Sequence, residues 1–173
     1  MREKKLITVA IDSPAAAGAG TQAKLIAKHY NLFKLETGMI YRLIGNMRLK
    51  NPKKFNYTSI KKKIKNLKIY DLENKNLLSD KIAISASVVA KDKNIRNIVY
   101  KFQQNCAYHP PKKYAGSVLD GRDITSVILK DAMFKFYITA NINVRAKRRF
   151  LELKKFKKKI TYKDVLKSLR KRD

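Results

Sequence analysis

The part of this chain that most constrains its fold is the N-terminal segment, where an apolar run leads through small residues into a helix. The run LITVAI (6–11) is short, apolar and rich in β-branched residues, as expected of a buried strand. The loop DSPAAAGAG follows, and helical spacing runs from near Thr21 to about Tyr30. A strand, a small-residue loop and a helix in this order are typical of α/β folds that bind phosphate at the start of the helix.

The later sequence extends this pattern into an α/β domain with a parallel sheet. A short apolar piece at 33–35 and helical spacing at 40–47 predict a second strand and a second helix. SVLD (117–120) and FKFYIT (134–139) are expected to be buried parallel strands, which brings the sheet to at least four strands. Residues 143–173 predict two basic helices.

Residues from about 51 to 108 are predicted to form a small subdomain inserted into this core. SIKKKIKNLKIY (59–70) indicates a helix that turns into a strand, and LENKNLLSD (72–80) indicates a hairpin-like tip. From Ile82 to about Cys106 the pattern is helical, with an interruption near Asp92 to Asn94, and it halts at two prolines after His109. The chain has no internal repeat and no long linker, so residues 1–173 are expected to form a single domain.

The strongly basic composition favours phosphate-bearing partners. Lys and Arg total 41 against 13 Asp and Glu, which gives a formal net charge of +28. Such a charge binds nucleic acid without sequence specificity through counterion release, but it also fits a biased composition that covers solvated faces with lysine. The single cysteine, Cys106, excludes an intrachain disulfide and fits the cytoplasm. No apolar run reaches the roughly 18 residues of a membrane span, so we expect no membrane association.

The loop from Ser13 to Thr21 has the composition of a phosphate-binding loop. Backbone N–H groups and the helix N-terminus favour anions there, and the Thr21 hydroxyl can coordinate Mg²⁺. Ala19 occupies the position at which such loops carry a lysine. Lys24 lies roughly 140° further around the helix and is expected to face elsewhere. The alternative is that this segment is only a turn between a strand and a helix.

Four strings together resemble bacterial cytidylate kinases, which belong to the nucleoside monophosphate (NMP) kinase family of P-loop kinases. They are LETGMIYR (35–42), SASVVA (85–90), LDGRDITSVILKDA (119–132) and FKFYITANINVRAKRR (134–149). The first three are similar to L-D-[ST]-G-x-x-Y-R, A-A-S-x-V-A and D-G-R-D-[IM]-G-T-x-V-x-P-x-A, in the same order. In NMP kinases the phosphate loop commonly reads G-x-x-G-x-G-K-G-T. The resemblance covers nearly the whole chain.

The resemblance implies a three-layer α/β P-loop kinase core with a parallel sheet. It adds an inserted NMP-binding subdomain at about 51–108 and a basic helical lid at about 150–173. The family's final strand and helix have no counterpart in this sequence, so we expect the lid region to be truncated.

By the resemblance, the activity is that of a (d)CMP kinase. Such an enzyme transfers phosphoryl from ATP to CMP or dCMP with Mg²⁺ as cofactor, and gives ADP with CDP or dCDP. It is expected to be a cytoplasmic monomer whose partners are small-molecule nucleotides. One alternative is a weakly active or inactive nucleotide-binding relative, because Ala19 replaces the lysine. Another is a basic nucleic-acid-binding module. A preference among CMP, dCMP and UMP stays open.

Site residues follow from the loop and the resemblance. Donor phosphates are assigned to the turn of Ala17, Gly18, Ala19, Gly20 and Thr21, with Thr21 also on the metal. The CMP site is assigned to Thr37, Arg42, Ser87, Arg122 and Asp123. Catalytic roles are assigned to Arg122 and to Arg172, which lies in the string KRD that matches the lid's E-R-D.

Several of these assignments have structural alternatives. The Thr37 hydroxyl is expected to cap a helix, to contact the acceptor, or to do both. Arg122 could instead form a surface ion pair with Asp120. Where the family has a basic residue before a glutamine, this chain has Phe102, and Lys101 is a candidate substitute. The basic helix that leads into the lid contains Arg145, Arg148 and Arg149, which are as compatible with a solvated face as with phosphate contacts.

Overall fold

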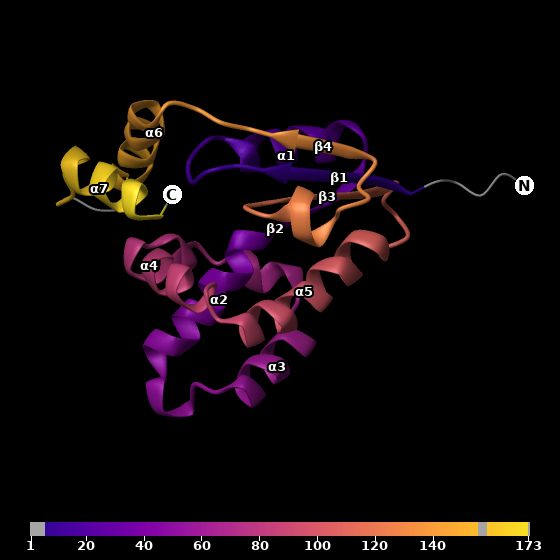
Figure 1. Ribbon diagram of the computed structural model, residues 1–173, viewed down its shortest axis with the longest axis horizontal. Coiled ribbons are helices and arrows are strands. Elements are labelled where there is room, and N and C mark those ends of the chain that lie inside the picture. Colours follow the sequence, from indigo (N-terminus) through magenta and orange to yellow (C-terminus); the bar gives the residue numbers. More distant parts are fainter. Residues whose placement is uncertain (1–5, 156–158, 173) are drawn as a thin grey trace, which may run out of the picture.

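A parallel sheet forms the centre of the protein. The computed structural model describes residues 6–155 and 159–172, with the backbone alone for Arg172. Four strands pair in the order β2-β3-β1-β4, and all three pairings are parallel (Figure 1). They are β1 (Ile7–Asp12), β2 (Leu32–Glu36), β3 (Gly116–Gly121) and β4 (Phe134–Tyr137). The predicted α/β fold with a parallel sheet is confirmed.

Helices cover both faces of the sheet and complete three layers. Helix α1 (Ala19–His29) lies on one face, whereas α2 (Thr37–Lys50) and α5 (Lys93–Tyr108) lie on the other (Figure 1). Alternate residues of β1 point to opposite faces, as strand geometry requires. Val9 and Ile11 pack in the cluster under α1, while Ala10 belongs to the larger cluster under α2 and α5.

The segment between α2 and β3 is helical in the structure, and the strand and hairpin predicted within 59–80 are wrong. It contains η1 (Pro52–Lys54), α3 (Tyr57–Lys65), η2 (Ile69–Glu73), η3 (Lys75–Leu78), α4 (Asp80–Val89) and α5. The three η segments are short 3₁₀ helices. Leu72 and Leu77 are buried from such turns, and the Asn74 side chain accepts a hydrogen bond from the Asn76 N–H at 3.0 Å. Short polar side chains that bond the local backbone favour turns over a hairpin. The division into a separate subdomain stays a prediction.

The predicted break in the long helical pattern is confirmed at Asp92, which lies between α4 and α5. Its Oδ1 accepts hydrogen bonds from the N–H groups of Asn94 at 2.8 Å and Ile95 at 3.0 Å. This side chain satisfies backbone donors that α5 leaves unpaired at its start. The cap therefore ends one helical run and begins the next.

Strand β4 is an exposed edge, so the prediction that FKFYIT forms a buried strand is wrong in that respect. The side chains of Phe134, Phe136 and Tyr137 are exposed by 48%, 46% and 72%. A single run of apolar and β-branched residues cannot distinguish a central strand from an edge strand, because burial depends on segments distant in sequence. After β3 a π-helical turn, η4 (Ile124–Ile128), leads towards this edge.

The two basic helices predicted near the C-terminus are present as α6 (Ile142–Lys154) and α7 (Tyr162–Arg172), which pack side by side (Figure 1). Leu153, Val165 and Leu169 form their shared apolar cluster, and Ala15 of the loop after β1 packs against it. The pair thus lies against the N-terminal loop. In the described ranges, no helix is both long and apolar enough to cross a lipid bilayer.

The close contact between α2 and α4 generates a stability prediction. A Cβ atom at Gly45 would lie 2.7 Å from the backbone nitrogen of Ala86. We therefore expect Gly45→Ala to lower the free energy of unfolding by about 1–3 kcal/mol in urea denaturation, because overpacking forces the helices apart.

The matched control is Gly38→Ala in the same helix, where nothing lies within 4 Å of the added Cβ. Removal of a flexible glycine should raise stability there by about 0.5–1 kcal/mol. Equal stability of the two variants would show that α2 and α4 do not pack as described.

Candidate functional site

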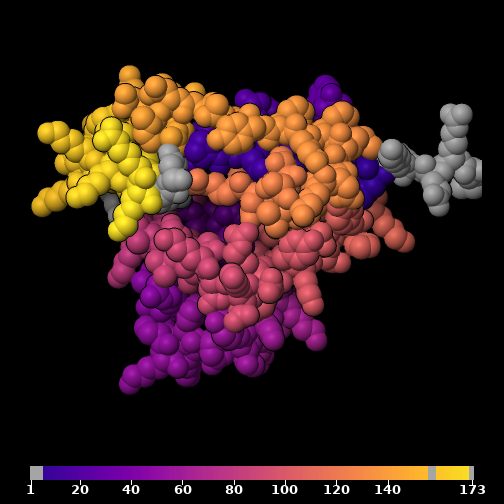
Figure 2. Space-filling view, in the orientation of Figure 1, coloured from indigo at the N-terminus to yellow at the C-terminus, as the bar shows by residue number. Residues whose placement is uncertain are grey.

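A cleft of about 400 Å³ opens where β1, β2 and β3 end, between the loop of residues 13–21 and the α6–α7 pair. Figure 2 shows this face hollowed beside the C-terminal helices, with indigo N-terminal atoms at the bottom of the hollow. Charged residues from β2, α2, β3 and α6, and from the residue that follows β3, meet there. They are Glu36, Arg42, Asp120, Arg122, Arg149 and Glu152.

The loop of residues 13–21 has a backbone suited to anions although two positions at which NMP kinases commonly have glycine are occupied by other residues. Ala16 has φ 61° and Gly18 has φ 104°, both in the left-handed region. An L-residue in that region costs roughly 1–2 kcal/mol, so the surrounding contacts hold Ala16 in place. Gly18 directly precedes α1, and the Ser13 N–H donates to the Gly121 carbonyl at 2.9 Å. The helix N-terminus therefore faces the cleft.

The lysine position of the loop is filled by Ala19, which lines the cleft and is 4% exposed. Lys24 is exposed and faces away, as predicted. Among the residues described, no lysine lines the cleft. Its positive charge therefore comes from arginines.

Two of these arginines hold the same stretch of backbone. Arg42 donates from Nη1 to the Leu77 carbonyl at 2.7 Å, and Arg149 donates from Nη2 to the Leu78 carbonyl at 2.8 Å. Arg149 also pairs with Asp80 at 3.2 Å and with Glu152 at 2.8 Å. Phosphate oxygens are stronger acceptors for guanidinium than neutral carbonyls are. A polyanion in the cleft can therefore compete for these donors.

Two carboxylates, from the ends of β2 and β3, lie close to the loop. Asp120 Oδ2 and Glu36 Oε2 each lie 3.8 Å from the point where a Cβ of Gly20 would be. Asp120 is 6% exposed, and its Oδ1 has no hydrogen-bond partner among the described residues. Burial, followed by the repulsion of Glu36, raises the pKa of Asp120 to about 7.

These carboxylates, together with the Thr21 hydroxyl, fit Mg²⁺. Oxygen ligands suit this ion, and an unpartnered buried carboxylate oxygen is a group that a cation satisfies. Within the described ranges, no three His, Cys, Asp or Glu side chains gather as a metal site. Mg²⁺ ordinarily binds one or two carboxylates and takes its remaining ligands from waters and substrate phosphates. Sequence reasoning named Thr21 and missed Glu36 and Asp120. The available signal was that both carboxylates lie where apolar parallel strands end.

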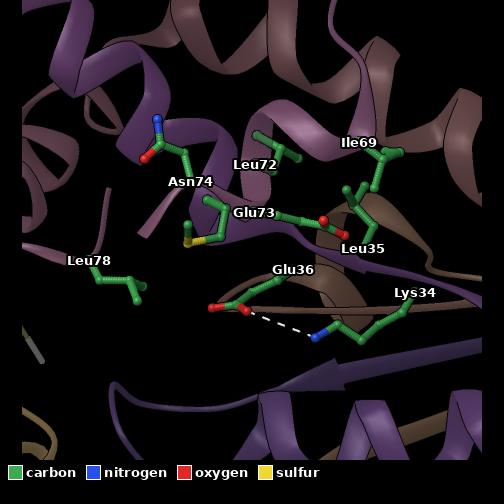
Figure 3. A pocket seen from close by; sticks show the side chains of 9 residues that line it. Lys34, Leu35, Glu36, Ile69, Leu72, Glu73, Asn74 and Leu78 are labelled. Carbon is green, nitrogen blue, oxygen red and sulfur yellow. Dashed lines mark ion pairs between the residues drawn. The ribbon is translucent and has the colours of Figure 1, made fainter. Parts of the chain in front are cut away.

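A second cavity of about 250 Å³ adjoins the cleft, with Glu36 and Leu78 lining both. Figure 3 shows it between β2 and the η2–η3 segment, with Leu72 and Asn74 on the side opposite Glu36. Glu36 Oε2 lies 3.9 Å from Lys34 Nζ, and Figure 3 marks this ion pair with a dashed line. The η2–η3 segment thus forms a wall that is continuous with the cleft.

Asp123 forms an ion pair with Arg96 of α5. Burial raises the pKa of the neighbouring Tyr41 hydroxyl to about 12, with Arg96 and Asp123 as smaller opposing influences. Sequence reasoning missed Arg96, because one arginine on a polar helix is indistinguishable from a solvated one until its partner is known. The structure therefore places a basic residue of α5, Arg96, beside the predicted site residue Asp123.

The remaining predicted residues lie at or beyond the edge of the cleft. Thr37 is 3% exposed and donates to the Asp120 carbonyl at 2.9 Å, and no side chain caps α2, so the capping prediction is wrong. Ser87 donates within α4 to the Ala83 carbonyl at 2.9 Å and does not line the cleft. Lys101 lines a separate groove between α3 and α5, and its role as a substitute stays a prediction. The Arg172 side chain lies outside the described residues.

Comparison with known proteins gives the affiliation of the chain. The cytidylate kinase family model matches residues 9–173. This chain belongs to the cytidylate kinase family. A cytidylate kinase of Clostridium botulinum is 39% identical over 178 residues, which covers 96% of this chain and 80% of that protein. Cytidylate kinases of Bartonella tribocorum and Bartonella bacilliformis are 40% and 41% identical and are covered over 77% and 75% of their lengths. The predicted family is confirmed.

The raised pKa of Asp120 predicts how the stability of this cytidylate kinase family member depends on pH. Because its pKa rises from 3.8 to about 7 on folding, the native state binds the extra proton, and stability from this group falls as pH rises from about 4 to 7. We expect Asp120→Asn to unfold at nearly the wild-type urea midpoint at pH 4. Above pH 7 the variant should be more stable, by at most about 4 kcal/mol.

The control is Asp131→Asn. A hydrogen bond from Tyr108 lowers the pKa of Asp131, so this substitution should lose stability towards neutral pH. If the difference in free energy of unfolding between Asp120→Asn and the wild type does not change with pH, Asp120 is not the buried, unpartnered carboxylate described above.

Proposed function

We propose that this protein transfers the γ-phosphoryl group of ATP to CMP or dCMP. A phosphate oxygen of the acceptor attacks the γ-phosphorus, the bond to the β–γ bridging oxygen breaks, and ADP leaves with that electron pair. The observation that carries the proposal is the joining of the loop of residues 13–21 to Arg42 and Arg122 in one cleft. Membership of the cytidylate kinase family supports the nucleotide substrates.

The donor side is proposed to lie at the loop. Backbone N–H groups from Ala17 to Thr21 bind the β- and γ-phosphates at the start of α1. Thr21, Glu36 and Asp120 line the cleft and would hold Mg²⁺ there. When bound, Mg²⁺ neutralises charge that develops on the phosphate oxygens.

The acceptor side is proposed to lie beyond the end of β3. Arg42 and Arg122 bind the acceptor phosphate, since a guanidinium matches phosphate oxygens with paired donors. Asp123, positioned by Arg96, accepts a hydrogen bond from the exocyclic amino group of cytosine, with Ser87 as a further contact. Uracil presents a carbonyl at that position and would leave the carboxylate unsatisfied. This arrangement favours cytosine over uracil.

Catalysis in this site is proposed to consist of positioning and charge stabilisation. The transition state of phosphoryl transfer is loose, so cations around the transferred group contribute more than a general base. Arg122 lines the cleft, and Arg149 reaches it from α6. Arg172, from the end of α7, remains a proposed contact to the transferring oxygens.

The proposal is tested by calorimetric titration with CMP and by CMP-dependent formation of ADP. We expect saturable CMP binding and turnover, with weaker responses to UMP and AMP. Arg42→Ala and Arg122→Ala should each weaken CMP binding by about 10- to 100-fold, because each removes a charged hydrogen-bond donor. Arg48→Ala is the matched control, since Arg48 lies in the exposed last turn of α2.

The opposite result supports a different class of protein. If CMP does not bind and RNA binding falls steeply with salt, the kinase proposal fails and the nucleic-acid-binding alternative stands. If CMP and ATP bind but no ADP forms, the protein is an inactive nucleotide-binding relative.

A further inference from the structure

Helix α6 reaches the phosphate loop with two arginines three residues apart. Arg145 Nη1 donates to the Ala15 carbonyl at 3.1 Å, and Arg148 Nη1 donates to the Ala17 carbonyl at 3.1 Å. One turn of helix thus matches two alternate carbonyls of the loop. These contacts bring cationic groups to the loop in which Ala19 replaces the lysine.

Arg148 differs from the other α6 arginines in its surroundings. Arg145 is 6% exposed and also donates from Nε to the Ala140 carbonyl at 2.9 Å, while Arg149 is paired with Asp80 and Glu152. Arg148 is exposed and forms no ion pair with the described residues. Its guanidinium has five N–H donors, and the Ala17 carbonyl uses one of them.

The position of Arg148 relative to the loop is also specific. Its Nη1 lies 3.6 Å from the point where a Cβ of Gly18 would be, and Gly18 directly precedes Ala19. The cationic head is therefore at the N-terminus of α1, where donor phosphates are proposed to bind. A guanidinium stays charged in any such environment and offers paired donors to phosphate oxygens.

We propose that Arg148 binds the β- and γ-phosphates of ATP and supplies from α6 the positive charge that Ala19 cannot supply from the loop. This inference rests on the proposed function and identifies how its donor site works without a loop lysine. Because the cation is rooted in α6, phosphate binding depends on the docking of the α6–α7 pair against the loop.

The test measures kcat with ATP and CMP, and ATP affinity by calorimetry, for Arg148→Met with and without Ala19→Lys. We expect Arg148→Met alone to lower kcat by about 100-fold or more, as expected on removal of one strong electrostatic donor, and to weaken ATP binding by at least about tenfold. CMP affinity should not change. With Ala19→Lys present, the same substitution should cost less than about tenfold, because a lysine then provides the charge.

Two controls separate phosphate binding from support of the loop. Lys147→Met removes the same charge from an exposed neighbouring position and should leave kcat unchanged. Arg145→Met removes a hydrogen bond to a loop carbonyl, and its effect should not be rescued by Ala19→Lys. Rescue of Arg148→Gly by added guanidinium ion provides a second readout that does not depend on the folding of Ala19→Lys.

The outcomes distinguish this inference from the proposed function. If the wild-type protein forms no ADP with CMP, the proposed function fails, and ATP affinity still decides the role of Arg148. The inference is overturned if Arg148→Met binds ATP as tightly as the wild type does. It is also overturned if Arg148→Met lowers kcat by the same factor with and without Ala19→Lys.

Discussion

The parallel register of β1, β2 and β3 is the constraint on which the site depends. Asp12 is level with Gly121, and Glu36 is level with Asp120, so the three strands end at one edge of the sheet. The segments that follow each strand must therefore meet, although they are far apart in sequence. The Thr37 hydroxyl then joins the start of α2 to the Asp120 carbonyl at 2.9 Å. Strand register thus brings the loop of residues 13–21, the two carboxylates and the arginines Arg42 and Arg122 together.

Elements with strong local patterns were predictable from the sequence, and elements that depend on distant partners were not. Strands β1 to β3 and helices α1 and α2 follow from apolar periodicity, and the break between α4 and α5 follows from the interruption of the helical pattern near Asp92. The segment at 66–80 was predicted wrongly because Leu72 and Leu77 are buried from 3₁₀ turns, where their spacing carries no strand or helix period. Strand β4 was placed correctly in the chain, but its exposure depends on what lies beside it.

The same division applies to the site. The loop composition and the strings around Arg42 and Arg122 indicated a phosphate cleft, and the structure brings these residues together. Asp120, Arg96 and Arg148 acquire their roles only from groups that the fold brings near. Arg148, for example, is separated by 131 positions from the carbonyl that it binds, and no local pattern encodes such a contact. A basic helix in a chain of charge +28 offers many arginines, and only the fold selects among them.

The location of positive charge has a consequence for how the cleft responds to nucleotides. A lysine at the start of α1 would move with the loop, whereas an arginine on α6 joins the loop to the α6–α7 pair. Arg149 joins the same helix to the inserted segment through the Leu78 carbonyl and Asp80, and Arg42 binds the adjoining Leu77 carbonyl. Phosphates compete with these carbonyls for the same donors, because charge-assisted hydrogen bonds are roughly twice as strong as neutral ones. If phosphates bind these arginines as proposed, binding redistributes the contacts that hold the α6–α7 pair and the segment between α2 and β3. Substrate affinity and the arrangement of these elements are then coupled.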